Sequence, residues 1–100
     1  MRLLLALLAL CALAGCGPIR STAALIDADV AIEGARAAGA PQASPYEFTL
    51  AEAYLNKARE VSGYAQYEVA ARYAGRAREL GDEARKNATS ASNRTKQEEK

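Results

Sequence analysis

Residues 39–45 read GAPQASP, and no helix can pass through this stretch because two prolines and a glycine lie close together in it. Apolar residues recur at helical spacing on both sides of it. The segments with this spacing run from 23 to 38, from about Tyr46 to Gly63, and from about Gln66 to Lys86. We therefore expect an all-α protein in which residues 23–86 form a small three-helix bundle.

Residues that favour helix ends support these boundaries. Gly39 and Gly63 stand where the first and second helices should stop, because glycine readily closes the last turn. Ser44 can cap the second helix, with Pro45 at its first position and Glu47 at its third.

The expected buried faces consist mainly of alanine, so large side chains in the core are few although 50% of the chain is hydrophobic. Gly75 and Gly81 each weaken the third helix by up to about 1 kcal/mol relative to alanine. Either glycine can mark a close contact between helices. The residues expected on the buried faces are Leu25, Ala28, Ile32 and Ala35, then Leu50, Ala51, Tyr54, Ala58 and Val61, then Tyr67, Ala70, Ala74, Ala77, Gly81 and Ala84.

Beyond the third helix, the sequence ATSASNRTKQEEK contains almost nothing apolar apart from Ala88 and Ala91. A segment of this composition buries too little surface to offset the entropy lost on ordering. Residues 87–100 are therefore expected to form a flexible tail.

The first residues have the layout of a secretory signal. Met1 and Arg2 give a positive end, and an uncharged apolar run follows from Leu3 to Leu13. A helix that spans a bilayer needs about 20 apolar residues, and this run is shorter. Residues 1–15 are therefore expected to be a signal peptide that is removed.

The stretch Leu13-Ala14-Gly15-Cys16 resembles the lipobox of bacterial lipoproteins. The resemblance implies cleavage between Gly15 and Cys16, diacylglycerol on the Cys16 sulfur and acylation of the new amino group. Gly17 follows where an aspartate would retain such a protein in the inner membrane, which implies the periplasmic side of the outer membrane. The alternative is a plain secretory signal with an incidental Cys16.

The mature chain has no free thiol once Cys11 is removed and Cys16 is acylated. No cofactor is expected besides the covalent lipid on Cys16. Gly17 and Pro18 precede any periodic pattern, so residues 16–22 are expected to be a lipidated tether.

Charge and composition limit the partners. Removal of Arg2 leaves twelve basic and twelve acidic residues, so nucleic acid is not an expected partner. The chain has no histidine, and no spacing typical of metal ligands or of a phosphate loop is present in the sequence. The carboxylate pairs are interpreted as solvated surface groups, and neither an enzyme nor a small-molecule substrate is expected; these pairs are Glu47 with Glu52 and Asp27 with Asp29.

Tyrosines are concentrated in the second half of the helical region, and tyrosine is enriched both in helix-packing cores and at interfaces. Tyr54 and Tyr67 are expected in the core. Tyr64 and Tyr73 are the candidate interaction residues, together with Arg72 and Arg76 on the polar side of the third helix.

From Ala51 to Leu80 the pattern resembles a tetratricopeptide repeat, and it does so most closely over GYAQYEVAARYAGRA. Ala74 stands where a bulky aromatic is usual and Asp82 where proline is usual, and only one copy is present where stacked arrays need about three. The resemblance implies an antiparallel helical hairpin. The matching residues are Tyr54, Ala58, Tyr67, Ala70 and Ala77.

With the lipobox, the chain also resembles a family of bacterial lipoproteins that carry an uncharacterised Ala-rich helical domain. The function expected from these features is that of a lipid-anchored interaction or scaffolding module. It would dock an envelope protein or a second copy of itself. The alternative is a structural tether, because Lys100 resembles the terminal lysine through which the murein lipoprotein is linked to peptidoglycan.

Overall fold

The computed structural model describes residues 1–14 and 16–99, without the side chains of residues 13–17. Its described part is helical and contains no strand, which confirms the all-α class. The helices are α1 (Arg2–Ala14), α2 (Cys16–Ala37), α3 (Ala40–Ala43), α4 (Pro45–Gly63) and α5 (Tyr67–Glu98). Within residues 1–14 and 16–99, no helix is both long enough and apolar enough to cross a membrane.

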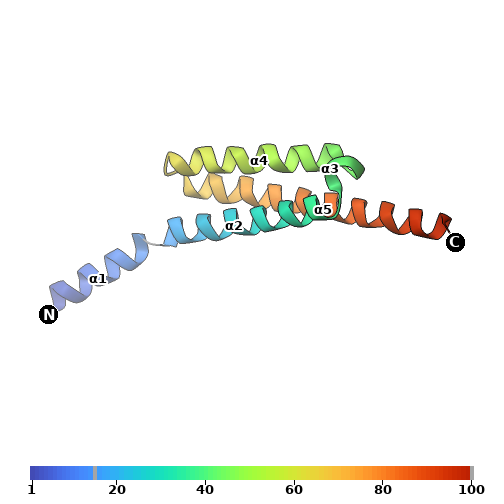
Figure 1. Ribbon diagram of the computed structural model, residues 1–100. Coiled ribbons are helices and arrows are strands. Elements are labelled where there is room, and N and C mark those ends of the chain that lie inside the picture. The colour runs from blue at the N-terminus through green and yellow to red at the C-terminus, as the bar shows by residue number, and fades with distance from the viewer. Residues whose placement is uncertain (15, 100) are drawn as a thin grey trace.

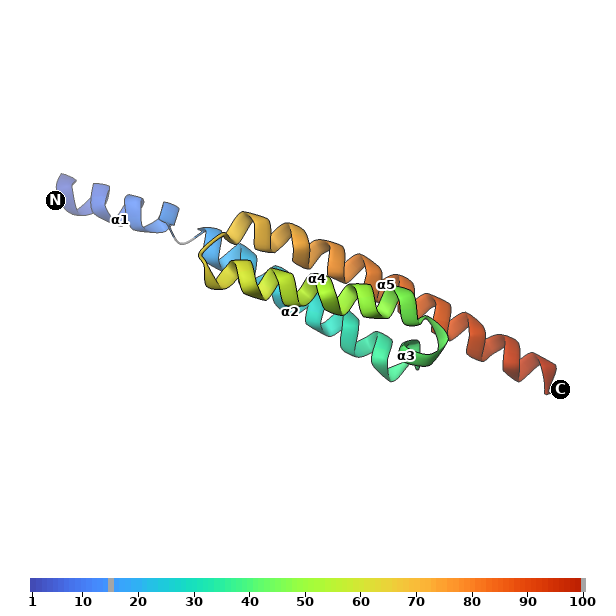
Figure 2. The same cartoon turned by 90° about the horizontal axis from the view of Figure 1, so that it is seen from above.

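The long helices α2, α4 and α5 pack side by side as a three-helix bundle (Figures 1 and 2). Helix α5 contacts both of the others extensively, and α3 closes the bundle where α2 turns into α4. Helix α1 leads away from one end, and the last turns of α5 project from the other. The expected three-helix bundle is confirmed. The antiparallel hairpin of α4 and α5 is present, while its likeness to a tetratricopeptide repeat stays a prediction.

The helix ends around residues 39–45 follow the local chemistry. Gly39 adopts the left-handed conformation, with φ of 85°, that side chains with a Cβ disfavour. Ser44 stands at the N-cap position of α4 and Pro45 is the first residue of the helix, as expected, but the Ser44 hydroxyl bonds the Glu47 side chain and makes no cap hydrogen bond with the backbone. The expected loop contains the short helix α3, which tolerates Pro41 because the amide of a first-turn residue needs no helical partner.

The bundle core consists of small side chains around a few large ones. Helix α4 buries Phe48 and Leu55 between the alanines, whereas Leu50 and Tyr54, expected in the core, are only half-buried. The face of α4 is therefore rotated from the expected one. Residues with less than one-tenth of their surface exposed in α5 are Ala70, Ala74, Ala77, Leu80, Gly81, Ala84 and Ala88.

Gly81 lies at a close approach of α2 and α5, as one of the two glycines was expected to do. A Cβ added there would lie 3.2 Å from the carbonyl carbon of Ala31 and 3.3 Å from the Ala31 Cβ. A Cβ on Gly75 would meet nothing within 4 Å.

Residues 16–22, expected to be a tether, are helical. Pro18 lies in the first turn of α2, where its missing N–H breaks no hydrogen bond. Thr22 Oγ1 donates a hydrogen bond to the Pro18 carbonyl at 2.8 Å, and Ser21 is buried in the bundle. Helix α2 therefore begins at Cys16, and among residues 18–22 only Ser21 is buried.

The expected flexible tail finds only weak support, because α5 continues as a helix to Glu98. Ala88 is 2% exposed, and the Asn87 Nδ2 donates to Ser44 Oγ at 3.1 Å. These two contacts hold the first turn of the segment on the bundle. Lys100 lies outside the described residues.

Candidate functional site

A groove with aromatic walls lies between α4 and α5. Its volume is about 170 Å³, and the rings of Tyr54 and Tyr73 lie 6.0 Å apart between centroids at an interplanar angle of 35°. Tyrosine offers both an apolar ring and a hydroxyl group for contact with a partner. We call this surface the α4–α5 groove; it is lined by Leu50, Ala53, Tyr54, Lys57 and Tyr73, and a neighbouring hollow is lined by Val69, Arg72 and Tyr73.

The groove has a basic rim. Lys57 pairs with Glu60 at 3.5 Å, and Arg76 Nη1 donates to Glu79 at 3.1 Å. This hydrogen bond to Glu79 raises the pKa of Arg76 above its usual value, and the nearby Tyr54 adds to the effect. Within the described residues, Arg72 forms no ion pair, so its charge is available to a partner.

The structure brings some of the candidate residues together and separates others. Tyr73 and Arg72 lie at the groove, and Arg76 lies next to its Tyr54 wall. Tyr64 is 74% exposed in the turn after α4 and does not line the groove. Lys57 and Ala53 are not among the residues predicted from the sequence, although their spacing from Leu50 and Tyr54 places all four on one side of a helix.

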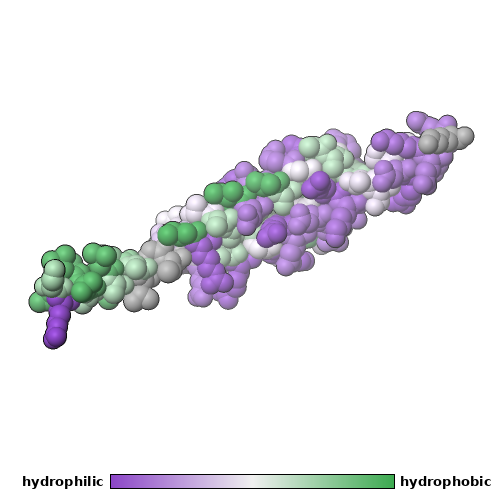
Figure 3. Space-filling model, turned by 90° about the horizontal axis from the view of Figure 1, so that it is seen from below, coloured by the Kyte–Doolittle hydropathy of each residue, from purple (hydrophilic) through white to green (hydrophobic). Residues whose placement is uncertain are grey.

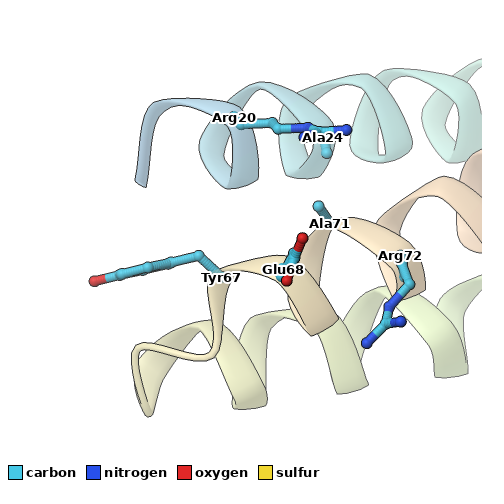
Figure 4. A pocket seen from close by; sticks show the side chains of 6 residues that line it. All are labelled: Arg20, Ala24, Tyr67, Glu68, Ala71 and Arg72. Atoms are coloured by element: carbon cyan, nitrogen blue, oxygen red, sulfur yellow. The ribbon is translucent and has the colours of Figure 1, made fainter. Parts of the chain in front are cut away.

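A second hollow, of about 430 Å³, lies between the first turns of α2 and α5 (Figure 4). The Glu68 carboxylate reaches toward α2, while Tyr67 points out of the hollow and Arg72 points away from α2. Only Arg20 and Glu68 therefore remain as polar groups on the two sides of the hollow. Tyr67, expected in the core, is half-buried at this edge.

The outer side of α2 exposes large apolar side chains. Ile19, Ile26 and Val30 are 72%, 57% and 65% exposed, and Ala23 lies exposed between them. Figure 3 shows apolar groups on the side of the bundle where α2 lies. We call Ile19, Ala23, Ile26 and Val30 the α2 apolar row.

The carboxylates singled out in the sequence each have a basic or hydroxyl partner. Asp29 and Asp27 flank the α2 apolar row and pair with Arg59 at 3.2 Å and with Arg78 at 3.9 Å. Glu52 pairs with Arg36 at 3.4 Å. These arginines hold the carboxylates apart as ion pairs on the surface between helices.

Ser44, Glu47 and Asn87 form a polar cluster where α3 and α4 meet α5. The buried Ser44 hydroxyl donates to the Glu47 carboxylate at 2.6 Å and accepts from Asn87 at 3.1 Å. The hydrogen bond from Ser44 lowers the pKa of Glu47, and the backbone amide of Glu47 itself contributes. The cluster links residues 43 positions apart in the sequence and connects α5 with the start of α4.

Glu47→Gln is expected to lower the free energy of unfolding at neutral pH, because the charged carboxylate accepts the Ser44 hydrogen bond more strongly. The folded pKa of Glu47 is depressed, so its contribution is present above the unfolded pKa and is lost as pH falls through the folded pKa. Urea titrations should therefore show a difference between wild type and variant that shrinks in acid. A difference that is constant with pH would contradict this account.

The family described as "Domain of unknown function (DUF4398)" matches residues 23–100 of the chain. The match begins within α2 and covers the rest of the bundle. No curated protein and no solved structure matches the chain significantly.

Proposed function

The chain belongs to the DUF4398 family, and we propose that it acts as a lipid-anchored interaction or scaffolding module on the periplasmic side of the outer membrane. The α4–α5 groove is the structural feature that supports the interaction role. The lipobox-like residues 13–16 support the anchor. The exposed apolar side chains of α1 agree with a leader that is not part of the bundle.

The chemistry of the groove favours one kind of partner. Leu50, Tyr54 and Tyr73 offer half-buried apolar surface, and such surface is typical of the anchoring pockets of protein interfaces. Lys57 and Arg72 lie along the same surface, and Arg72 has no acidic partner in the described part of the chain. The groove therefore suits an amphipathic segment that carries apolar side chains on one face and acidic ones beside them.

A photoreactive amino acid placed at Ala53, inside the groove, should form one discrete crosslinked product in cells. Gln42 is exposed on α3, away from the groove, and provides the control position. Truncation at Tyr73 should weaken the product at Ala53, because Tyr73 is the residue of α5 that lines the groove. Equal products from Ala53 and Gln42, or a product indifferent to Tyr73→Ala, would refute the groove as the binding surface.

The projection of α5 is the observation that favours the second candidate function, a tether to peptidoglycan through Lys100. Helix α5 extends past the bundle on the side opposite α1 (Figure 1). Its helical geometry shortens the reach, because a helix rises about 1.5 Å per residue where an extended chain covers about 3.3 Å. Digestion of purified sacculi should release a peptide that contains Lys100; its absence would eliminate the tether.

A further inference from the structure

The α2 apolar row lies on the side of α2 opposite the bundle core. Ile19, Ala23, Ile26 and Val30 follow one another at steps of four, three and four residues, so they share an arc of about 60° at 100° per residue. Cys16, the first residue of α2, continues the same register three positions before Ile19. The buried residues of α2 occupy the opposite arc; they are Ser21, Ala28, Ile32 and Ala35.

The row ends at an acidic residue, and the aspartates beside it are paired with arginines. Glu33 occupies the next position after Val30 and ends the row. Asp29 and Asp27 border it, but Arg59 from α4 and Arg78 from α5 each reach one of them. Arg20 adds a cation near the Cys16 end and forms no ion pair in the described part of the chain. The border therefore carries no unpaired anion from these aspartates.

The size of the row argues against a second copy as the occupant. Its exposed side chains offer on the order of 400 Å², about half of the roughly 800 Å² that each partner buries in a standard interface. An interfacial helix has no such threshold when a separate anchor already holds it at a membrane. An apolar face with a free cation beside it, here Arg20, is a feature of a helix that lies in the headgroup region.

We propose that α2 lies along the membrane surface, with the row Ile19, Ala23, Ile26 and Val30 in the headgroup region of the bilayer. The proposal rests on the lipid anchor of the proposed function, because the register that runs from Cys16 to Val30 places the anchor position and the row on one side of the helix. The residues that line the α4–α5 groove all come from α4 and α5. A membrane against α2 therefore leaves the groove open to a periplasmic partner.

The test uses the mature lipoprotein in vesicles of phosphatidylethanolamine and phosphatidylglycerol with brominated acyl chains. An environment-sensitive fluorophore is attached at Val30→Cys, or at Thr49→Cys on α4 as the matched control. The label at position 30 should be quenched by the brominated lipids and shift to the blue, and the label at position 49 should do neither. Ile26→Asp should abolish the quenching at position 30, whereas Ile26→Leu should retain it.

Intact mass of the same samples separates this proposal from the proposed function. If Cys16 carries lipid but the label at position 30 is not quenched, the docking of α2 on the membrane is overturned. The lipid anchor is then still supported. An unmodified Cys16 overturns both. Energy transfer between labels at position 30 in dilute protein without vesicles would show that a second copy occupies the row, and that result also overturns the proposal.

Discussion

The variant Cys16→Ser is expected to accumulate as a precursor that retains residues 1–15 and carries no lipid. The thiolate sulfur is the nucleophile to which the lipid would be attached, and a hydroxyl group is far less reactive in that role. Each buried methylene of an acyl chain contributes about 0.8 kcal/mol to membrane attachment, so loss of the lipid removes the whole anchor. Intact mass and fractionation of membranes measure both effects.

Cys11→Ser is the matched control, because Cys11 is exposed in α1 and lies upstream of the expected cleavage point. This variant should be processed and lipidated as the wild type is. Lipidated mature protein from Cys16→Ser, or an unmodified cysteine at position 16 in the wild type, would contradict the anchored function. The bundle would then stand as a helical domain with the α4–α5 groove.

Gly81→Leu is expected to destabilise the bundle by about 2–3 kcal/mol, the upper part of the range for overpacked cores. A Cβ at this position lies 3.2 Å from a backbone atom of Ala31, and the rest of a leucine side chain would force α2 and α5 apart. Small domains have only a few kcal/mol of net stability, so the loss is a large fraction of the total. Urea unfolding followed by circular dichroism measures it.

Gly75→Leu provides the matched control on the same helix. Gly75 is exposed and its added Cβ would meet nothing within 4 Å, so the higher helix propensity of leucine should stabilise the protein by about 0.5–1 kcal/mol. Opposite signs at the two glycines are the expected result. Equal effects at Gly75 and Gly81 would show that the close approach of α2 and α5 does not limit the packing.

Local chemistry fixed the helix boundaries that could be predicted. Gly39, Ser44 and Pro45 act through their own backbone geometry, which does not depend on distant residues. The alanines of α5 likewise predicted its buried face, because their spacing of three and four residues defines one side of a helix. The sequence also gives Tyr73, Arg72 and Arg76 as candidate interaction residues, but it does not predict that they lie at or beside one groove.

Tertiary packing determines which side of α4 is buried, and the sequence does not predict this. Either Leu50 and Tyr54 or Phe48 and Leu55 satisfies the helical spacing of α4, and the contacts with α2 and α5 select the second pair for the core. This selection leaves Leu50 and Tyr54 at the edge, where they form the groove with Tyr73.

The all-α class, the breaks between the helices and the small residues along their contacts can be predicted from the residues alone, because these features depend on backbone conformation and on short-range periodicity. The full extent of α2 and α5 cannot be predicted in this way, because it depends on contacts within the folded bundle. The turns at residues 16–22 and at 87–88 are helical where Ser21 and Ala88 become buried and where Asn87 reaches Ser44. The hydrogen bond between Asn87 and Ser44 joins residues far apart in the chain. Together with the burial of Ala88, its free energy offsets the entropy of ordering a segment whose own composition does not favour order.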